Sequence, residues 1–336
     1  PSLTDPYAWT AGRILVGFCF SGVYVTAESW LNDSTDNENR GQALALYMIM
    51  QMLGIVTSQA LLVLADPAGF ILFIIPSVLI SLAFTPILLS ISPVPAHASA
   101  KPLSLRRIWQ ASPLGCMGML LLGGIFSAQF GMASVFGTQA GLSVAQISTF
   151  VSAFFVGALV LQYPIGWLSD RMDRRLLILA SSAILGGAAT FGALFSGAFW
   201  AITAAALVVG GMSNPLYSLI LAYVNDYLDH EEMAGAAGAM VFINGLGAVF
   251  GPLMLGWIMD AFGPPGFFIF IACLGLGLAA YAAFRMTIRA APSASETDSY
   301  AIVTMSASPA AVSIATEYAI ETAQDEDTGE NLRPSG

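Results

Sequence analysis

A stripe of polar residues follows one face of the first apolar segment. Its members are Thr10, Arg13, Gly17, Ser21, Tyr24 and Glu28, at spacings of 3, 4, 4, 3 and 4 residues. Such spacing places all of them on one side of a helix. A charge deep in a membrane helix costs about 2.5 to 3.5 kcal/mol on insertion scales, so Arg13 requires a cavity or a partner. The stripe predicts a pathway for a solute or a proton, with snorkelling of Arg13 to the near end as the alternative.

Glu28 lies at the far end of the same stripe, about 22 Å from Arg13 at 1.5 Å of rise per residue. That separation excludes a direct pair within one helix. Glu28 is therefore expected to titrate or to pair with Arg40, and the ion pair is the interpretation we favour.

Amides and phenols recur in the other apolar segments. Helix packing does not require their polar groups, so they are expected to line a cavity or to form interhelical hydrogen bonds. These candidates are Gln51, Gln129, Gln162, Tyr163, Asn214, Tyr217 and Asn244. Small residues serve close helix packing, and Gly247, Gly251 and Gly256 are predicted to be packing positions. A cavity with so little fixed charge favours a small organic solute.

The elements that carry these residues are apolar segments of membrane-spanning length. The chain has 336 residues, of which 57% are hydrophobic and only 10% are charged, and its mean hydropathy is +0.76. About 20 apolar residues in helix cross a bilayer core. Nine such runs predict an all-α integral membrane protein, with spans at residues 8–31, 41–64, 69–92, 113–137, 144–168, 175–195, 198–227, 235–259 and 266–287.

Basic residues lie almost entirely on one set of connections between these segments. Of the 11 lysines and arginines, ten belong to this set: Arg40, Lys101, Arg106, Arg107, Arg171, Arg174, Arg175, Arg285, Arg289 and Arg333. Basic loops mark the cytoplasmic side. We therefore expect a multi-pass protein of the cell inner membrane with its acidic tail in the cytoplasm. Residues 1–289 contain 13 acids and 10 bases, which argues against a nucleic-acid partner.

The chain repeats itself at an offset of 193 residues. The matched pairs are Val16 with Val209, Gly17 with Gly210, Tyr24 with Tyr217, Asn32 with Asn225, Asp33 with Asp226, Glu38 with Glu231 and Gly54 with Gly247. A parallel repeat six spans apart is typical of transporters built from two six-helix halves. If the first span is the fourth of its half, three spans precede it, and the nine spans are helices 4 to 12 of twelve.

The repeat also predicts the domain boundaries. Residues 1–92 form the end of a first six-helix bundle, 93–112 form a cytoplasmic loop between bundles, and 113–289 form the second bundle. Residues 290–336 are expected to be a disordered acidic tail, although the apolar stretch 301–320 could form an element on a partner.

The sequence GWLSDRMDRR at residues 166–175 resembles the cytoplasmic signature loop of the major facilitator superfamily. The matching positions are Gly166, Asp170, Arg171, Arg174 and Arg175. The first span, with Arg13 and Gly17, is similar to the fourth-helix motif of that family, and Arg40 with Gly41 resembles the start of its fifth helix. GLGAVFGP at 245–252 resembles an antiporter motif, but the equivalent MLGIVTSQ lacks the proline, so antiport is not predicted.

The resemblance implies a secondary transporter that works by alternating access. It also implies a role for Arg13 in proton or substrate coupling. We expect Asp170 to meet Arg40 and Gly41 as an inner gate, with Asp226 at the equivalent end of the repeat. The protein is expected to be a monomer without a cofactor or a metal. The alternatives are a receptor or sensor, or an integral-membrane enzyme, for which no catalytic motif is visible.

Overall fold

The computed structural model describes residues 5–33, 37–64, 69–89, 103–169 and 171–288, together with residues 303, 308, 311, 312 and 315. Within these residues all regular structure is helical, which confirms the all-α prediction. The helices are α1 (Pro6–Asp33), α2 (Asn37–Leu61), α3 (Ile71–Leu89), α4 (Leu105–Ala111), α5 (Pro113–Ser127), η1 (Ala128–Met132), α6 (Ala133–Gln139), α7 (Val144–Ser169), α8 (Arg174–Leu194), α9 (Phe199–Asn225), α10 (His230–Phe262) and α11 (Pro265–Ile288).

Seven of the predicted spans are long and apolar enough to cross a membrane in the described part of the chain. They comprise α1, the continuous run of α5, η1 and α6, and α7 to α11. The predicted spans 41–64 and 69–92 coincide with α2 and α3, whose described apolar parts, Leu46–Leu61 and Ile71–Thr85, are shorter. The count of nine therefore stays a prediction, whereas the multi-span architecture is confirmed.

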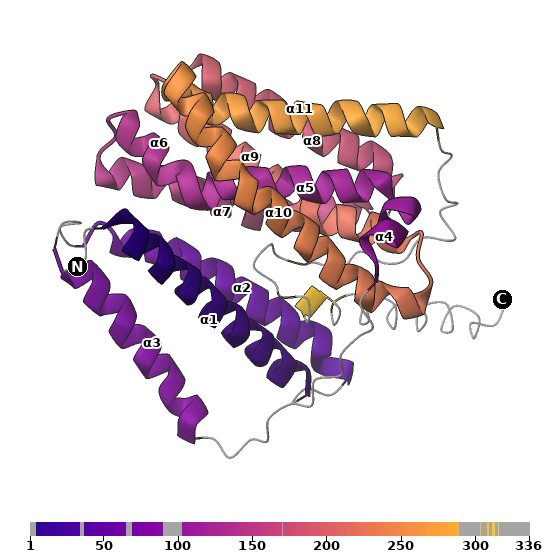
Figure 1. The fold of residues 1–336 in the computed structure, drawn as a ribbon, viewed down its shortest axis with the longest axis horizontal. Helices are drawn as coiled ribbons and strands as arrows, with labels where there is room; N and C mark the ends of the chain where they lie inside the picture. The colour runs from indigo at the N-terminus through magenta and orange to yellow at the C-terminus, as the bar shows by residue number, and fades with distance from the viewer. Residues whose placement is uncertain are drawn as a thin grey trace, which may run out of the picture.

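The helices form two parts (Figure 1). Helices α5 to α11 pack into one bundle, in which α5 contacts α10, α7 contacts α9, and α8 contacts both α9 and α11. Helices α1, α2 and α3 form a separate layer beside it, joined to the bundle mainly where α2 meets α7. At that junction Ser148 Oγ donates a hydrogen bond of 2.5 Å to the Gln59 carbonyl.

Local sequence signals set the helix boundaries in the bundle. The Ser112 side chain accepts from the Gly115 amide and caps α5, where Pro113 occupies the first turn. The α10 helix stops at Gly263, whose φ of 68° favours glycine, and Pro265 starts α11. Pro164, Pro215 and Pro252 lie inside helices, as membrane helices permit.

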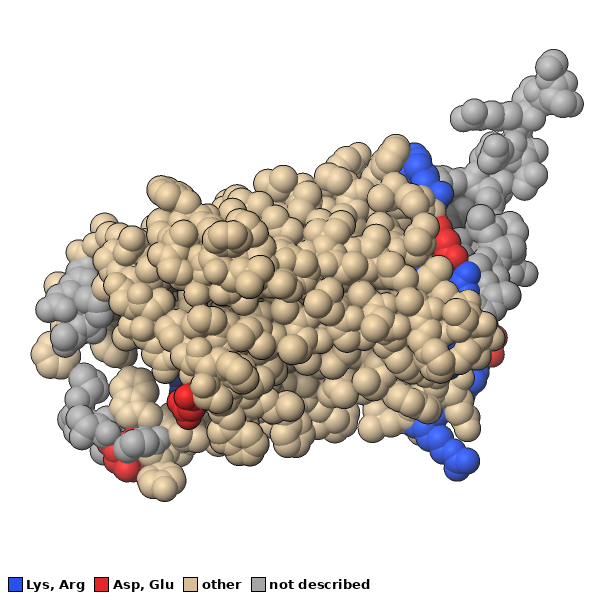
Figure 2. All heavy atoms as spheres, turned by 90° about the horizontal axis from the view of Figure 1, so that it is seen from above, with Lys and Arg blue, Asp and Glu red and all other residues tan. Residues whose placement is uncertain are grey.

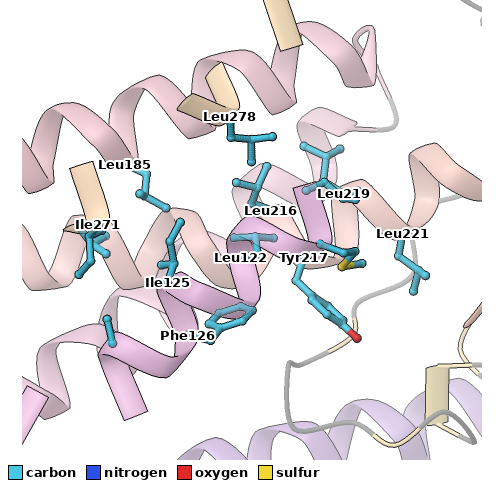
Figure 3. Packing of buried hydrophobic residues seen from close by; sticks show 14 of the residues in the cluster. Leu122, Ile125, Phe126, Leu185, Leu216, Tyr217, Leu219, Leu221, Ile271 and Leu278 are labelled. Carbon is cyan, nitrogen blue, oxygen red and sulfur yellow. The ribbon is translucent and has the colours of Figure 1, made fainter. Parts of the chain in front are cut away.

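Aliphatic and aromatic side chains fill the bundle interior. Leu122 and Ile125 of α5 meet Leu185 of α8, Leu216 of α9 and Leu278 of α11 in one cluster (Figure 3). Glycines let the helices approach: a methyl group at Gly247 would overlap the Leu120 carbonyl, and one at Gly251 would overlap the Ser127 hydroxyl. The packing prediction is thus confirmed for both glycines. It is wrong for Gly256, which has open space around it.

Charged side chains avoid the middle of the molecule. Figure 2 shows blue Lys and Arg side chains gathered at one end and a wide uncharged band between this end and the other. Arg106 and Arg107 lie in α4 and Arg285 in the last turn of α11, and α4 and this end of α11 lie on the same side in Figure 1. An uncharged band of this kind suits the hydrocarbon core of a bilayer.

Candidate functional site

A chain of hydrogen bonds links three polar residues of the α1–α2 layer. The Tyr47 hydroxyl donates to Glu28 Oε1 at 2.9 Å, and Gln51 Nε2 donates to the Tyr47 hydroxyl oxygen at 3.2 Å. Glu28 is only 1% exposed. A buried carboxylate requires donors, and here uncharged groups supply them. The side chain of Arg40, the partner that the sequence favours, lies outside the described residues.

A second polar group lies on α7 and α9 of the bundle. Gln162 Nε2 donates to Ser218 Oγ at 3.4 Å. One turn earlier on α9, Asn214 Nδ2 donates to the Gly210 carbonyl of its own helix at 3.2 Å. The Asn214 side chain is buried, and its Oδ1 has no hydrogen-bond partner within the described chain. An unpaired buried acceptor is costly, so this oxygen is suited to receive a donor from a bound molecule.

Residues of the C-terminal tail connect the two polar groups. Ser218 Oγ donates to the Val303 carbonyl at 2.7 Å, and the Val303 amide donates back to Ser218 Oγ at 3.0 Å. The Ser308 amide donates to Glu28 Oε2 at 3.1 Å. A chain extends at most about 3.6 Å per residue, so positions 303 and 308 lie within about 18 Å of each other. The described tail residues therefore contact both α1, through Glu28, and α9, through Ser218.

Five residues of the predicted tail are described, and all of them are buried: Val303, Ser308, Ala311, Val312 and Ala315. Most of them are small and apolar, so they fit among helices despite the acidic composition of the tail as a whole. The expected disorder of 290–336 as a whole stays a prediction.

Gln129 and Asn244 form hydrogen bonds between helices inside the bundle. Gln129 lies in the π-helical turn η1 and donates through Nε2 to Ser213 Oγ at 2.9 Å. Asn244 Nδ2 donates to the Met119 carbonyl at 3.0 Å and joins α10 to α5. Both bonds therefore join different helices. Turns of π-helix frequently occur at functional sites, and nothing in the sequence predicted this one.

The aromatic ring of Tyr217 packs in the apolar core. The ring is 6.1 Å from that of Phe126, between centroids, and the residue is 1% exposed. Its hydroxyl points away from Leu216 and Leu122 (Figure 3).

The other predicted residues differ in their distance from these groups. Arg13 is exposed and has no hydrogen bond or ion pair to another described residue. Tyr163 is 72% exposed. Tyr24 is half-buried, with its ring 6.2 Å from Phe20, and lies one turn before Glu28 on α1, near enough to Tyr47 to interact with it electrostatically.

The predicted gate residues lie at the basic end. Arg174 and Asp226 form a buried ion pair between α8 and the end of α9. Asp173 caps α8 and pairs with Arg175 at 2.8 Å, which lowers the pKa of the Asp173 carboxyl. Gly166 is buried in α7, and the Arg171 guanidinium lies 4.2 Å from the centroid of the Trp167 ring. Asp170 and the side chains of Arg40 and Gly41 lie outside the described residues.

A further ion pair at this end was not predicted. Arg107 of α4 contacts Glu232 of α10 through two bonds, Nε to Oε1 at 3.0 Å and Nη2 to Oε2 at 2.8 Å. The arginine lowers the pKa of the Glu232 carboxyl. The pair ties the connection before the bundle to the start of α10.

Sequence reasoning also missed Ser218. Its signal was the spacing of four residues from Gly210 to Asn214 and again to Ser218, which continues a polar stripe on α9. Among the described residues there is no group of three His, Cys, Asp or Glu that could hold a metal ion.

Comparison with known proteins gives consistent matches. The family model described as Major Facilitator Superfamily matches residues 114–314. An uncharacterized MFS-type transporter of Yersinia enterocolitica, YE1530, is 28% identical over 288 residues, which cover 81% of this chain and 71% of that protein. The Bacillus subtilis protein YfkF, also named an uncharacterized MFS-type transporter, is 24% identical over 278 residues, which cover 80% of this chain and 70% of YfkF. Escherichia coli YcaD, with the same description, is 26% identical over 281 residues, which cover 79% of this chain and 69% of that protein.

Proposed function

Because the chain belongs to the Major Facilitator Superfamily, we propose that it is a secondary active transporter that moves a small organic solute across a bacterial inner membrane by alternating access. The solute would bind in the space between the α1–α2 layer and the bundle. The observation that carries this assignment is the buried, unpaired Asn214 Oδ1, one turn from Ser218 and Gln162. The amides of Asn214 and Gln162 and the hydroxyl of Ser218 are uncharged, so they favour a solute with hydrogen-bond donors.

The layer would move against the bundle during transport. Its described side chains are largely exposed along α1 and α3, whereas the bundle is closely packed, so the bundle is suited to move as one body. We propose that the basic end is cytoplasmic, that the protein acts as a monomer, and that Asp170 meets Arg40 and Gly41 when this end closes. The Arg174–Asp226 pair would hold α8 to α9 beside that gate. A transport rate unchanged in Asp170→Ala would rule out the gate.

Proton coupling is a second part of the proposal. Glu28 is a buried acid in the layer and Arg13 shares its helix face, so both are candidates for the coupling. A transport rate that responds to an imposed pH gradient in the parent protein, and no longer responds in Glu28→Gln, supports this role.

The test uses purified protein in proteoliposomes. Uncharged organic solutes are first screened for stabilisation of the protein against heat, because a ligand that binds only the folded state raises its stability. Flux of each stabilising radiolabelled solute is then measured. Asn214→Ala is expected to raise KM about tenfold, the loss of one good hydrogen bond. Tyr163→Phe changes an exposed side chain and is expected to leave KM unchanged.

Absence of flux for every solute that binds would contradict a carrier. That result would favour the receptor class, in which the solute binds but does not cross.

A further inference from the structure

We propose that Glu28 and Ser218 form a binding site for a peptide segment and that the chain's own C-terminal segment occupies it, closing the transport pathway. The proposal goes beyond the transport assignment, on which only its closing effect depends. Its basis is the set of hydrogen bonds that the described tail residues form with both sides of the space.

The Ser218 end recognises one residue of the segment through its backbone N–H and C=O groups. The hydroxyl accepts from the Val303 amide at 3.0 Å and donates to the Val303 carbonyl at 2.7 Å. A serine hydroxyl has one donor and two acceptor positions, so it is suited to this exchange. Gln162 Nε2 lies 3.4 Å from the same oxygen and can use its remaining acceptor position.

The Glu28 end supplies a carboxylate to a peptide amide. Ser308 donates its amide to both carboxylate oxygens, at 3.3 and 3.1 Å, while the Tyr47 hydroxyl donates to Oε1. The bond between the Val312 amide and the Ser308 carbonyl, at 3.1 Å, closes a helical turn beyond this contact. Bonds from amide donors to a carboxylate are among the stronger hydrogen bonds of proteins.

Apolar contacts complete the site. Val303, Ala311 and Val312 have no exposed surface, and they belong to the same hydrophobic cluster as Met48 and Met52 of α2. A solute that reaches Glu28 or Ser218 has to displace these tail residues.

The first experiment measures docking and needs no solute. Val312→Cys is introduced into a protein in nanodiscs whose Cys19, Cys116 and Cys273 are replaced by Ala, and its labelling by a water-soluble maleimide is timed. Thr287→Cys, at an exposed position of α11, is the reference. We expect Val312→Cys to react at least about tenfold more slowly than the reference, because its reaction requires local opening.

Second-site changes then test the two anchors. Glu28→Ala and Ser218→Ala are each expected to bring the labelling of Val312→Cys close to the reference rate. Ser213→Ala is the matched control, since Ser213 is also buried on α9 but bonds to Gln129. Labelling at the reference rate in the parent, or slow labelling that neither anchor change accelerates, would overturn the site.

Flux measurements test the closing effect. A chain that ends at residue 288 is expected to transport faster than the full chain, and a peptide of sequence 301–316 is expected to inhibit it. A shortened protein that binds solute but transports no faster would overturn the closing effect. If no solute crosses in either protein, the transport assignment fails, while maleimide labelling still decides whether the tail is docked.

Discussion

The two copies of the internal repeat lie in different surroundings. At the offset of 193, the starts of α1 (residue 6) and α2 (residue 37) map to 199 and 230, the first residues of α9 and α10. The start of α3 (residue 71) maps to 264, one residue before α11. The same helical plan therefore occurs twice. Yet no residue in the most apolar stretch of α1 is buried, whereas 78% of the residues in the most apolar stretch of α9 are buried.

Glycines show this difference position by position. A methyl group at Gly210 would overlap the Phe154 backbone, and one at Gly247 would overlap the Leu120 carbonyl. The equivalent Gly17 and Gly54 have no atom within 4 Å of such a methyl group. A glycine pattern thus allows close approach of helices, but the partner helix decides whether the approach occurs. The second copy carries the packing, and the first presents polar groups on helices free of such constraints.

The largest expected effect concerns the buried acid of each copy. Asp226→Asn leaves the Arg174 guanidinium buried without its counter-charge and is expected to lower the free energy of unfolding by about 3–5 kcal/mol. Glu28 is the buried acid of the first copy, although the residue that aligns with Asp226 is Asp33. Glu28 is held by the uncharged donors of Tyr47 and Ser308, so Glu28→Gln leaves no buried charge unpaired and is expected to cost less, about 1.5 kcal/mol. Thermal and denaturant unfolding in detergent measure both. Equal losses would show that the two copies do not differ in this way.

A smaller effect is expected at the paired glycines. Gly210→Ala and Gly247→Ala force helices apart, and each is expected to cost about 1–3 kcal/mol. Gly17→Ala and Gly54→Ala should change stability by no more than about 0.5 kcal/mol, as surface substitutions do. The same unfolding measurements apply. A loss at Gly17→Ala as large as at Gly210→Ala would mean that another helix packs against α1 in the native membrane.

The sequence predicted the helices well because membrane helices have a strong local signal. Long apolar runs, the offset repeat and the signature loop depend on residue type and spacing alone. The close approach at Gly247 was also predictable, since small residues at helical spacing permit it. The open surroundings of Gly256 were not, because they depend on which helix lies opposite.

The candidate site was less predictable because its partners are distant in sequence. Glu28 was expected to titrate or to pair with Arg40, whereas one observed partner, Ser308, is 280 positions away. The spacing of polar residues on α9 indicated Asn214 and left Ser218 unnoticed. Composition suggested a solvated tail, whereas the described residues Ala311 and Val312 are buried. Average charge over a segment cannot reveal a few residues that fit between helices.

The smallest expected effect concerns a difference in charge between the start of α2 and the start of α10. Glu232 near the start of α10 pairs with Arg107, whereas the equivalent position in α2 is the neutral Asn39. Arg107 lowers the folded-state pKa of Glu232, so the pair stabilises the folded protein fully above the unfolded pKa of about 4.3. That contribution is lost as the pH falls through the lower folded-state value. Because both side chains are partly exposed, the effect should be small and should weaken with salt.

The measurement is the melting temperature of the parent and of Glu232→Gln between pH 7 and pH 3. We expect the parent to be slightly more stable at pH 7 and the difference to vanish in acid, while Asn39→Ala shows no such pH dependence in its difference from the parent. A difference between parent and Glu232→Gln that persists unchanged at pH 3 would mean that the side chain acts by packing rather than by charge. The start of α10 would then be held as the rest of the second copy is, by close contact.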